Sequence, residues 1–123
     1  MQKTELKAFI ENLFKAWDNM DEEKITQIYN KDITIHMDDQ NAHYDDIIHR
    51  VQYCKKHYTS IQNDIKDIVI DDDGKVAVRL HQTNTHLDTG NTTLYKIAAI
   101  YHIENNQVTE MWGTFMPNIN YFE

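Results

Sequence analysis

The sequence predicts an α+β fold in which a curved, four-stranded antiparallel meander and one short earlier strand wrap around N-terminal helices. Before Ser60, apolar residues recur at three- and four-residue steps, which is typical of amphipathic helices. After Ser60, β-branched residues alternate with polar ones over long segments separated by turn sequences, which is typical of antiparallel strands. The predicted strands are also too long to lie flat in a chain of 123 residues.

Three helices are expected. Thr4 to Trp17 is the first, because its apolar residues form one stripe. Asp21 is the expected N-cap of a second, short helix, and Tyr44 to Tyr58 returns to helical spacing as the third. The apolar stripes consist of Leu6, Phe9, Ile10, Leu13, Phe14 and Trp17 in the first helix, and of Ile47, Ile48, Val51, Cys54 and Tyr58 in the third.

Five strands are expected. The first, Asp32 to Asp38, alternates apolar and polar residues with the period of a half-buried strand. Turn sequences at Asp72 to Gly74, Asp88 to Asn91 and Glu104 to Asn106 divide the rest of the chain. The four strands of the meander then cover Ile61 to Asp71, Lys75 to Leu87, Thr92 to Ile103 and Gln107 to Met116.

The length of these strands predicts curvature. At about 3.3 Å per residue, the segment Lys75 to Leu87 would extend about 43 Å. A compact domain of this length has a diameter of only about 35 Å. The sheet is therefore expected to curve strongly, with the helices in its hollow.

The composition indicates one globular domain over residues 1–123 and argues against several classes of partner. Lys and Arg number 12 against 20 Asp and Glu, so the net charge is −8. This charge repels phosphate backbones and anionic lipid, so neither nucleic acid nor a membrane surface is an expected partner. The N-terminal residues lack the apolar core of a secretory signal, so a cytoplasmic location is expected.

One face of the meander is expected to line the hollow. It carries Tyr95, Ile97, Ala99, Tyr101 and Ile103 in the third strand of the meander, and Thr109, Met111, Gly113 and Phe115 in the fourth. In the second strand this face begins as core and then turns polar at Gln82, Asn84 and His86. A buried face that becomes polar either emerges into solvent or lines a cavity that needs hydrogen-bonding groups.

The order and spacing of four segments resemble a known family. The segments are Ala16 to Asp21 with Ile25, Tyr29 to His36, Val76 to Leu80 with Thr85 and His86, and Tyr101 to Trp112. Together they resemble the nuclear transport factor 2-like superfamily, in its SnoaL-like and ketosteroid isomerase-like branches, over almost the whole chain. The resemblance implies a conical pocket between the sheet and the helices, and dimers formed through the outer face of the sheet.

The catalytic residues of these branches do not carry over. Matched to the isomerases, the positions of the helix-one tyrosine, the general-base aspartate and the oxyanion-hole aspartate hold Leu13, Met37 and Ala99. The histidine of the polyketide cyclases also falls at Ala99, and their aspartate falls at Gly113. Proton abstraction next to a carbonyl needs a base and a donor for the developing enolate, and these side chains supply neither.

We therefore expect a pocket for a small hydrophobic molecule, with any isomerase, cyclase or hydratase activity left open. Asn84 and His86 would be its polar anchors, and His86 is the best single catalytic candidate because imidazole titrates near neutral pH. A solvent-exposed histidine at the rim is the alternative for His86. The expected apolar walls are Leu13, Trp17, Met37, Tyr101 and Phe115.

No metal or cofactor is expected. His49 and His57 are eight residues apart on one helix, and His81 and His86 point to opposite faces of one strand, so neither pair has ligand spacing. The acidic segment Asp71 to Gly74 is expected to be a solvated hairpin turn rather than a calcium loop. The sequence contains no phosphate-binding loop and no dinucleotide fingerprint.

The alternative function is a non-catalytic, dimeric interaction or scaffold module with a vestigial pocket. The outer face of the predicted sheet carries an apolar patch, and such patches mark association. The expected homodimer interface consists of Ala98, Ile100, Trp112 and Thr114 with Met116, rimmed by Arg79, Lys96, His102 and Glu110. In the opposing interpretation, the tail Asn118 to Glu123 folds back over this patch within one chain.

Overall fold

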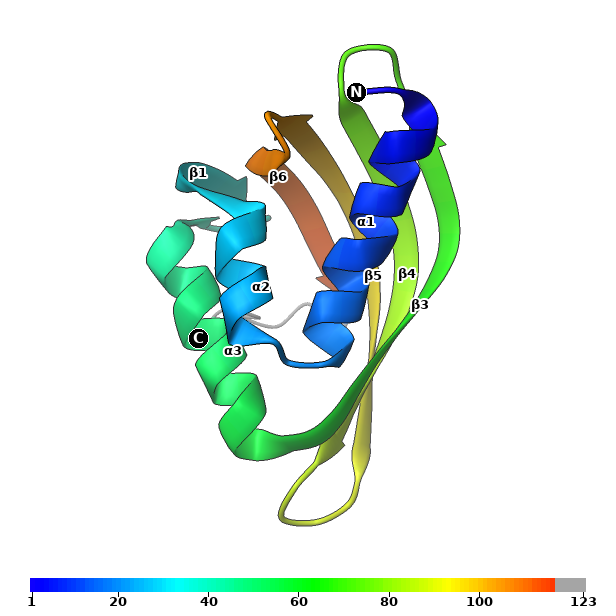
Figure 1. Ribbon diagram of the computed structural model, residues 1–123. Helices are drawn as coiled ribbons and strands as arrows, with labels where there is room; N and C mark the ends of the chain where they lie inside the picture. The colour runs from blue at the N-terminus through cyan, green and yellow to red at the C-terminus, as the bar shows by residue number, and fades with distance from the viewer. Residues whose placement is uncertain (117–123) are drawn as a thin grey trace.

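Three helices lie against the hollow face of one strongly curved, six-stranded sheet (Figure 1) in the computed structural model, which describes residues 1–116. The strand order is β2-β1-β6-β5-β4-β3, so β2 and β3 form the two edges and the sheet stays open. The predicted α+β class, with a curved meander around N-terminal helices, is confirmed.

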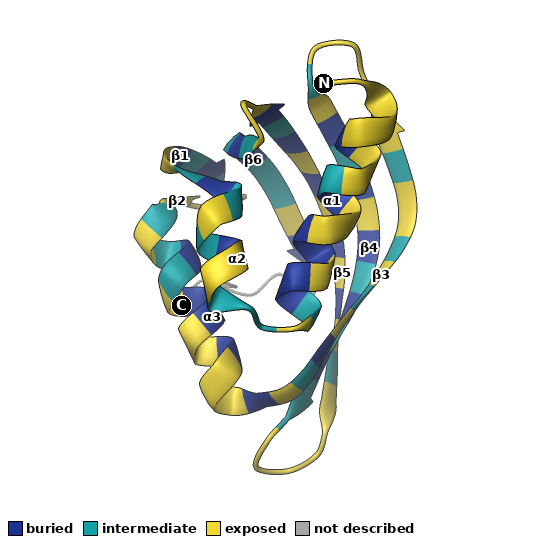
Figure 2. Ribbon diagram, viewed as in Figure 1, coloured by how far each residue is buried: buried dark blue, intermediate teal, exposed yellow. Residues whose placement is uncertain are grey.

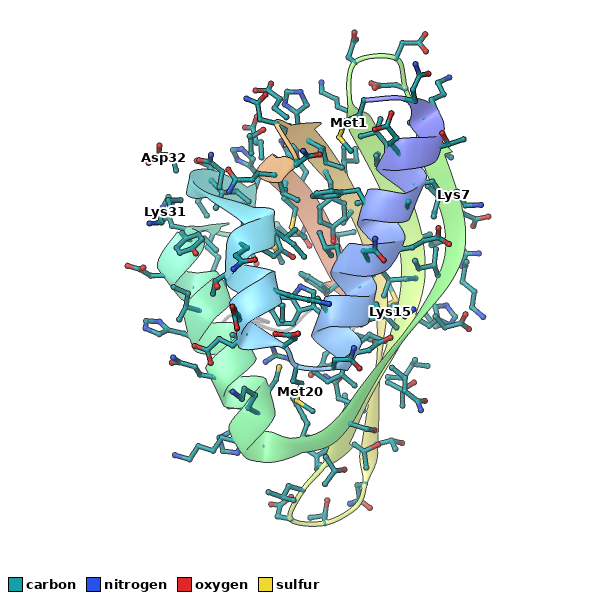
Figure 3. All side chains as sticks on the ribbon, viewed as in Figure 1. Met1, Lys7, Lys15, Met20, Lys31 and Asp32 are labelled. Carbon is teal, nitrogen blue, oxygen red and sulfur yellow. The ribbon has the colours of Figure 1, made fainter. Side chains whose placement is uncertain are left out.

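The helices form where the apolar stripes predicted them. They are α1 (Lys3–Asp18), α2 (Glu22–Ile28) and α3 (Tyr44–His57). The side chain of Asp21 caps α2 by accepting a hydrogen bond of 3.2 Å from the backbone N–H of Lys24, as expected. On α1 the apolar stripe faces the sheet, whereas Lys7 and Lys15 lie on its exposed side (Figure 3).

The strands differ from the prediction mainly at their ends. They are β1 (Tyr29–His36), β2 (Asn41–Ala42), β3 (Tyr58–Ile70), β4 (Lys75–His86), β5 (Thr92–Glu104) and β6 (Gln107–Met116). β1 begins three residues before the predicted Asp32 and ends at His36, so Met37 lies outside it. β3 begins at Tyr58, directly after α3, whereas the sequence predicted helix at that residue. The two-residue strand β2, which pairs with the end of β1, was not predicted.

The predicted turns close the hairpins of the meander. Gly74 has a φ of +84° between β3 and β4, and Asn105 and Asn106 have φ values of +52° and +61° between β5 and β6. These left-handed conformations suit glycine and asparagine. The sequence therefore located these two connections correctly.

A β-bulge between His102 and Ile103 corrects the predicted faces of β6. Simple alternation placed Thr109 in the hollow, but the shift brings Val108 inward, and its side chain is fully buried. The hydroxyl of Thr109 instead donates a hydrogen bond to the backbone oxygen of His102. Beyond the bulge, Met111 and Phe115 face inward as predicted.

The core lies between the helices and the sheet. Buried residues gather on the sides of α1, α2 and α3 that face the strands, and on the hollow face of β4, β5 and β6 (Figure 2). Within residues 1–116, none of the helices combines the length and the apolar character that crossing a lipid bilayer would require. The expected cytoplasmic location stays a prediction.

Candidate ligand site

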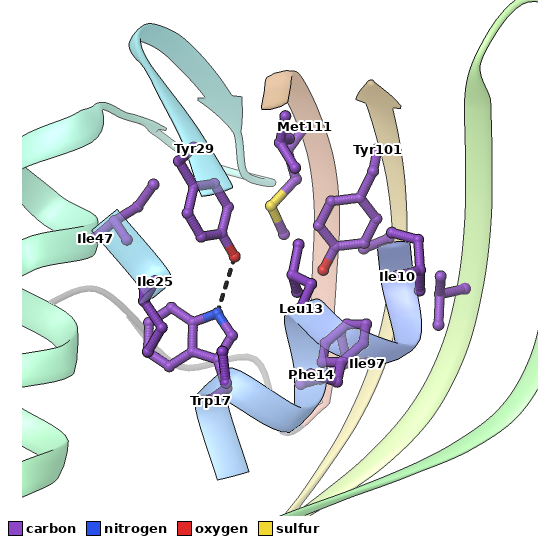
Figure 4. Close-up of a cluster of buried hydrophobic side chains, with 14 of the residues drawn as sticks. Ile10, Leu13, Phe14, Trp17, Ile25, Tyr29, Ile47, Ile97, Tyr101 and Met111 are labelled. Atoms are coloured by element: carbon purple, nitrogen blue, oxygen red, sulfur yellow. Dashed lines mark hydrogen bonds between the residues drawn. The ribbon is translucent and has the colours of Figure 1, made fainter. Parts of the chain in front are cut away.

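A small, mostly apolar cavity lies between α1 and the hollow face of the sheet. Figure 4 draws several of the side chains that line it. Its volume is about 40 Å³, which is enough for a few water molecules and well below the roughly 300 Å³ of an ordinary small-molecule site. Its walls come from α1, β1, α3, β4, β5 and β6, and they consist of Phe14, Trp17, Tyr29, Ile35, Ile47, Gln82, Ile97, Tyr101, Met111 and Phe115.

Aromatic side chains fix the walls of this cavity. The indole N–H of Trp17 donates a buried hydrogen bond of 2.9 Å to the hydroxyl of Tyr29. Phe14 packs edge-on against Tyr101, with 6.0 Å between the ring centroids and an interplanar angle of 84°. These contacts join α1 to β1 and β5, so the cavity is bounded by side chains that already have partners.

The structure brings together some of the predicted wall residues and separates others. Trp17, Tyr101 and Phe115 line the cavity. Leu13 is fully buried in the core on the stripe of α1, and Met37 lies just beyond β1. Their predicted contact with a ligand stays a prediction.

Sequence reasoning did not assign Tyr29 to the cavity wall, because its spacing from Ile25 and Ile28 placed it on the second, short helix. In the structure Tyr29 is the first residue of β1, and its side chain faces inward. Its position four residues before the inward Ile33 has the even spacing of one strand face, and this was the signal available in the sequence.

Three of the four positions matched in the sequence to the family's catalytic residues, Met37, Ala99 and Gly113, meet in one apolar contact. Ala99 and Gly113 are paired across β5 and β6. A Cβ atom placed on Gly113 would lie 3.7 Å from the sulfur of Met37 and 3.9 Å from the Cβ of Ala99. None of these side chains can accept or donate the proton that isomerase chemistry transfers.

A series of hydrogen bonds leads from Asp18 through Asn63 to Gln82 in the cavity wall. The carboxylate of Asp18 accepts two hydrogen bonds of 2.8 Å, from the backbone N–H and the side-chain amide of Asn63. The side-chain oxygen of Asn63 accepts a hydrogen bond of 2.8 Å from the amide of Gln82, which lines the cavity. Because an ionised carboxylate only accepts, this series fixes the orientation of both amides. Burial raises the pKa of Asp18, while the two hydrogen bonds oppose the shift.

Among the described residues, Asn84 is a buried polar group whose side chain has no hydrogen-bond partner. It lies two residues beyond Gln82 on the same face of β4, and its side chain is fully buried. Neither its Nδ2 nor its Oδ1 has a hydrogen-bond partner. Its neighbours across the sheet are Ile61 on β3 and Thr93 on β5. A buried amide without partners is rare in folded proteins, and such a group calls for an explanation.

His86 lies at the end of β4 and is half-buried. Its Nε2 lies 2.8 Å from the hydroxyl of Thr93, and its ring packs edge-on against Tyr58 at 5.1 Å between centroids. The imidazole is thus held by two neighbours rather than projecting freely at a rim. Its predicted role as an anchor or a base stays a prediction.

The other candidate groups of the interior have limited chemistry. Cys54 is fully buried, and burial raises the pKa of its thiol, although the charge of Arg50 acts in the opposite direction. The thiol is therefore neutral at physiological pH and is a poor nucleophile. Within residues 1–116, no three His, Cys, Asp or Glu side chains converge in an arrangement that could hold a metal ion.

The outer face of the sheet carries a much larger hollow, of about 670 Å³. The four predicted interface residues Ala98, Ile100, Trp112 and Thr114 all line it. We call this hollow the outer groove; it is lined by those four residues with His36, Met37, Asp38, Asp67, Val69, Ala77, Val78, Arg79, Ala99 and Gly113. The tail Asn118 to Glu123, which the opposing interpretation placed over this face, lies outside the described residues.

The outer groove has polar borders on both sides. Arg79 bonds Asp67 at 2.7 Å on one side, between β4 and β3. On the other side, the Nε2 atom of His36 lies 2.7 Å from Glu110, and its ring stacks on Trp112 at 5.4 Å. An apolar floor with a polar border is the usual composition of a protein interface.

Residues 10–111 match the family model of the SnoaL-like domain. The chain belongs to the SnoaL-like family. This membership confirms the resemblance found in the sequence. No curated protein sequence matches this SnoaL-like chain significantly.

Solved structures share the fold of this SnoaL-like domain at low sequence identity. AclR of Streptomyces galilaeus, a proposed hydroxylase, has a TM-score of 0.82 at 22% identity, over 93% of this chain and 76% of AclR. IdmH of Streptomyces antibioticus, a proposed polyketide cyclase, has a TM-score of 0.77 at 18% identity, over 91% of this chain and 92% of IdmH. A protein of Catenulispora acidiphila with a ketosteroid isomerase-like fold, solved with trimethylamine, has a TM-score of 0.70 at 9% identity, over 85% and 82% of the two chains. At these identities the likeness shows the fold alone.

Proposed function

We propose that this SnoaL-like domain binds a small, largely apolar molecule in its interior, with Asn84 as the polar anchor. The observation that carries the proposal is the side chain of Asn84, which is fully buried with both polar atoms unpartnered. Leaving such a group unsatisfied costs about 1–3 kcal/mol. A ligand that supplies a donor and an acceptor would recover this energy, whereas the empty protein cannot.

Binding rather than turnover is the activity we propose. Met37, Ala99 and Gly113 meet where the family's acid and base groups would stand, and none of them transfers protons. The names of AclR and IdmH associate this fold with hydroxylation and polyketide cyclisation. A related activity here would need other residues, and His86, which is held by Thr93 and Tyr58, is the remaining candidate.

The ligand has to enlarge the cavity that it enters. A volume of about 40 Å³ holds no more than a few water-sized groups. A ligand with ten or more heavy atoms therefore has to separate side chains that now touch, such as the edge-on pair Phe14 and Tyr101. Binding should consequently change the environment of these rings.

The test begins with the protein as purified from cells. Native mass spectrometry should show a reproducible small-molecule adduct on the wild-type chain. In a thermal-shift panel of hydrophobic compounds, some members should raise the melting temperature. The variant Asn84→Leu keeps the branched shape of the side chain but removes both polar atoms, so it should lose the adduct and the thermal shifts.

The matched control is Thr83→Val, which lies one residue away on the opposite face of β4. It should bind as the wild type does. An empty wild-type protein together with a panel that gives no shift would overturn the proposal. So would an Asn84→Leu variant that binds the same compounds with equal shifts.

As a second candidate, we propose that the domain forms a homodimer through the outer groove. The observation that favours it is the groove itself, an apolar hollow of about 670 Å³ that exposes Ile100 and borders the exposed Val69. Exposed apolar patches of this kind usually mark association. Contact with a second copy through a two-fold axis would cover both grooves and close the assembly.

A further inference from the structure

Rows of side chains cross the outer face of the sheet, because residues that pair on neighbouring strands stand side by side. The middle row of the outer groove runs from Ala77 on β4 through Ile100 on β5 to Trp112 on β6. Neighbouring strands are about 4.8 Å apart, and neighbouring rows on one face are about 7 Å apart. A small side chain thus stands on one side of Ile100 and a large one on the other. A partner that covers the groove has to fit this uneven floor.

The two sides of β5 also differ in charge. On β4, cations lie one row to either side of the middle row, at Lys75 and Arg79. On β6, Glu110 stands in the same row as Lys75, with His102 of β5 between them. The ammonium of Lys75 lies 5.9 Å from the ring centroid of Trp112, so this side chain reaches over the outer face towards β6. The β4 side of the groove therefore offers cations, and the β6 side offers a carboxylate.

These charged groups have neighbours within the chain. Arg79 bonds Asp67 at 2.7 Å, and the exposed Asp71 lies close enough to Lys75 to be attracted by its charge. The Oε2 atom of Glu110 lies 2.7 Å from the Nε2 atom of His36. Because a carboxylate has two oxygens, Glu110 keeps this contact when its other oxygen accepts a hydrogen bond from elsewhere. The pattern of charge across the groove is thus compatible with a further ion pair at Glu110.

A second copy can cover the groove in two orientations when the strands of the two sheets are aligned, which is a common arrangement of stacked sheets. If the two-fold axis runs along β5, the β6 side of one copy faces the β4 side of the other, and each row faces the same row. If the axis runs across the strands along the middle row, each strand faces itself, and the two flanking rows exchange places. The floor and the charges distinguish these orientations.

The axis along β5 gives complementary contacts. Trp112 then faces the partner's Ala77, and Lys75 faces the partner's Glu110. A large side chain opposite a small one fills the space between two sheets, and opposite charges attract.

The axis across the strands gives poor contacts. Trp112 then meets the partner's Trp112, while the two copies of Ala77 leave a gap. Lys75 faces the partner's Arg79, and the approach of like charges is costly.

We propose that the two-fold axis of the homodimer runs along β5, so that each Trp112 packs on the partner's Ala77 and each Lys75 pairs with the partner's Glu110. This inference rests on the proposed homodimer, because it gives the arrangement of the same interface. The apolar contacts then lie at the centre, and the ion pairs lie one row away at its border, which is the usual composition of an interface.

Charge reversal tests the pairing, with the dimer dissociation constant measured by sedimentation equilibrium. Lys75→Glu and Glu110→Lys should each raise the constant about tenfold or more, because each places like charges together twice in one dimer. The double variant restores opposite charges and should return to within about threefold of the wild type. Lys7→Glu makes the same charge change on the exposed side of α1 and should change the constant by less than about threefold.

Ala77→Leu tests the packing without a change of charge. With the axis along β5, the larger side chain collides with the partner's Trp112, so the dissociation constant should rise. With the axis across the strands, the same variant would fill the gap between the two copies of residue 77 and lower the constant. Lys75→Glu would also lower it in that orientation, because the new carboxylate would face the partner's Arg79.

The outcomes separate the axis from the homodimer. A dissociation constant that is unchanged or lowered in Lys75→Glu, or a double variant that dimerises no better than the single ones, would overturn the axis and leave the homodimer in place. A wild-type protein that is monomeric at micromolar concentration would overturn both. Circular dichroism checks the fold of each variant. If Lys75→Glu does not fold, Glu110→Lys and Ala77→Leu decide, since an unchanged constant in both would equally overturn the axis.

Discussion

The indole nitrogen of Trp17 donates a hydrogen bond of 2.9 Å to the hydroxyl of Tyr29 across the interior (Figure 4). Trp17 comes from the last turn of α1, and Tyr29 is the first residue of β1. The bond therefore ties the end of the first helix to the strand that pairs in parallel with β6. Both rings also line the cavity, so one contact serves the stability of the fold and the shape of the site.

Tyr29→Phe should lower the free energy of unfolding by about 1–3 kcal/mol, because it leaves the buried indole N–H of Trp17 without this acceptor. Urea unfolding followed by tryptophan fluorescence measures the change. Tyr53→Phe is the control, since Tyr53 is 40% exposed, and it should change the free energy by less than about 0.5 kcal/mol. Equal effects of the two variants would contradict the prediction.

Asn84→Leu should raise the free energy of unfolding of the empty protein by about 1–3 kcal/mol, because it replaces an unsatisfied buried amide with an apolar group of similar shape. Gln82→Leu, on the same face of β4, should have the opposite effect. It removes the donor that bonds the side-chain oxygen of Asn63 at 2.8 Å. Chemical denaturation of both variants measures the contrast. A loss of stability in Asn84→Leu would show that the amide is satisfied in the empty protein.

Asp18→Asn should change how stability depends on pH. Burial raises the pKa of Asp18 above its ordinary value of 3.8, so the folded protein binds this proton more tightly than the unfolded protein does. Ionisation of Asp18 therefore lowers the free energy of unfolding as the pH rises from below 3.8 through the raised pKa. The asparagine variant lacks this dependence and keeps an oxygen that accepts from Asn63. The free energy of unfolding of Asp18→Asn minus that of the wild type should therefore be more positive at pH 7 than at pH 3.

Asp64→Asn is the control with the opposite sign. The hydrogen bond from Lys66, and then its charge, lower the pKa of Asp64, so ionisation of this group favours the folded state as the pH rises. Relative to the wild type, Asp64→Asn should therefore be less stable at pH 7 than at pH 3, by a small amount because the pair is exposed. Urea midpoints at both pH values measure the two differences. If the stability difference from the wild type changes in the same direction with pH for both variants, the opposite pKa shifts assigned to Asp18 and Asp64 are wrong.

The fold followed from the sequence because its signals are local. The stripe of α1, the cap at Asp21 and the turn at Gly74 each act within a few residues and agree with one another. The errors arose where pairing with another strand decides the structure. Strand β2 exists only because Asn41 and Ala42 pair with the end of β1, and the bulge after His102 depends on the register between β5 and β6.

The site was less predictable because it depends on side-chain packing. Alternation along β4 placed Asn84 in the hollow, but no sequence pattern shows that both of its polar atoms lack partners. The small size of the cavity likewise follows from how Phe14, Trp17 and Tyr101 fill the space.

Two glycines should respond oppositely to a methyl group. In Gly113→Ala the new Cβ would make ordinary contacts of 3.5 Å with Met111 and 3.7 Å with Met37, so stability should stay the same or rise by about 0.5–1 kcal/mol. Gly74→Ala should be destabilising, because Gly74 has a φ of +84° and its Cβ would lie 2.9 Å from the backbone oxygen of Ile103. Thermal unfolding of both variants measures this. A large loss at Gly113 would mean that the contact with Met37 has no room to adjust.

Trp112→Glu should convert the proposed homodimer to monomers. Trp112 lines the outer groove, where a second copy would bury an introduced carboxylate, and burial of a charge is costly unless it is paired. Thr83→Glu adds the same charge to the outer side of β4 at a residue that does not line the groove, so this variant should remain dimeric. Sedimentation velocity at micromolar concentration distinguishes the species. In a monomer the carboxylate introduced at position 112 would stay in contact with water. The Trp112→Glu variant should therefore keep its fold, which circular dichroism measures. A wild-type protein that is already monomeric at this concentration, or a Trp112→Glu variant that remains dimeric, would remove the outer groove as the site of self-association.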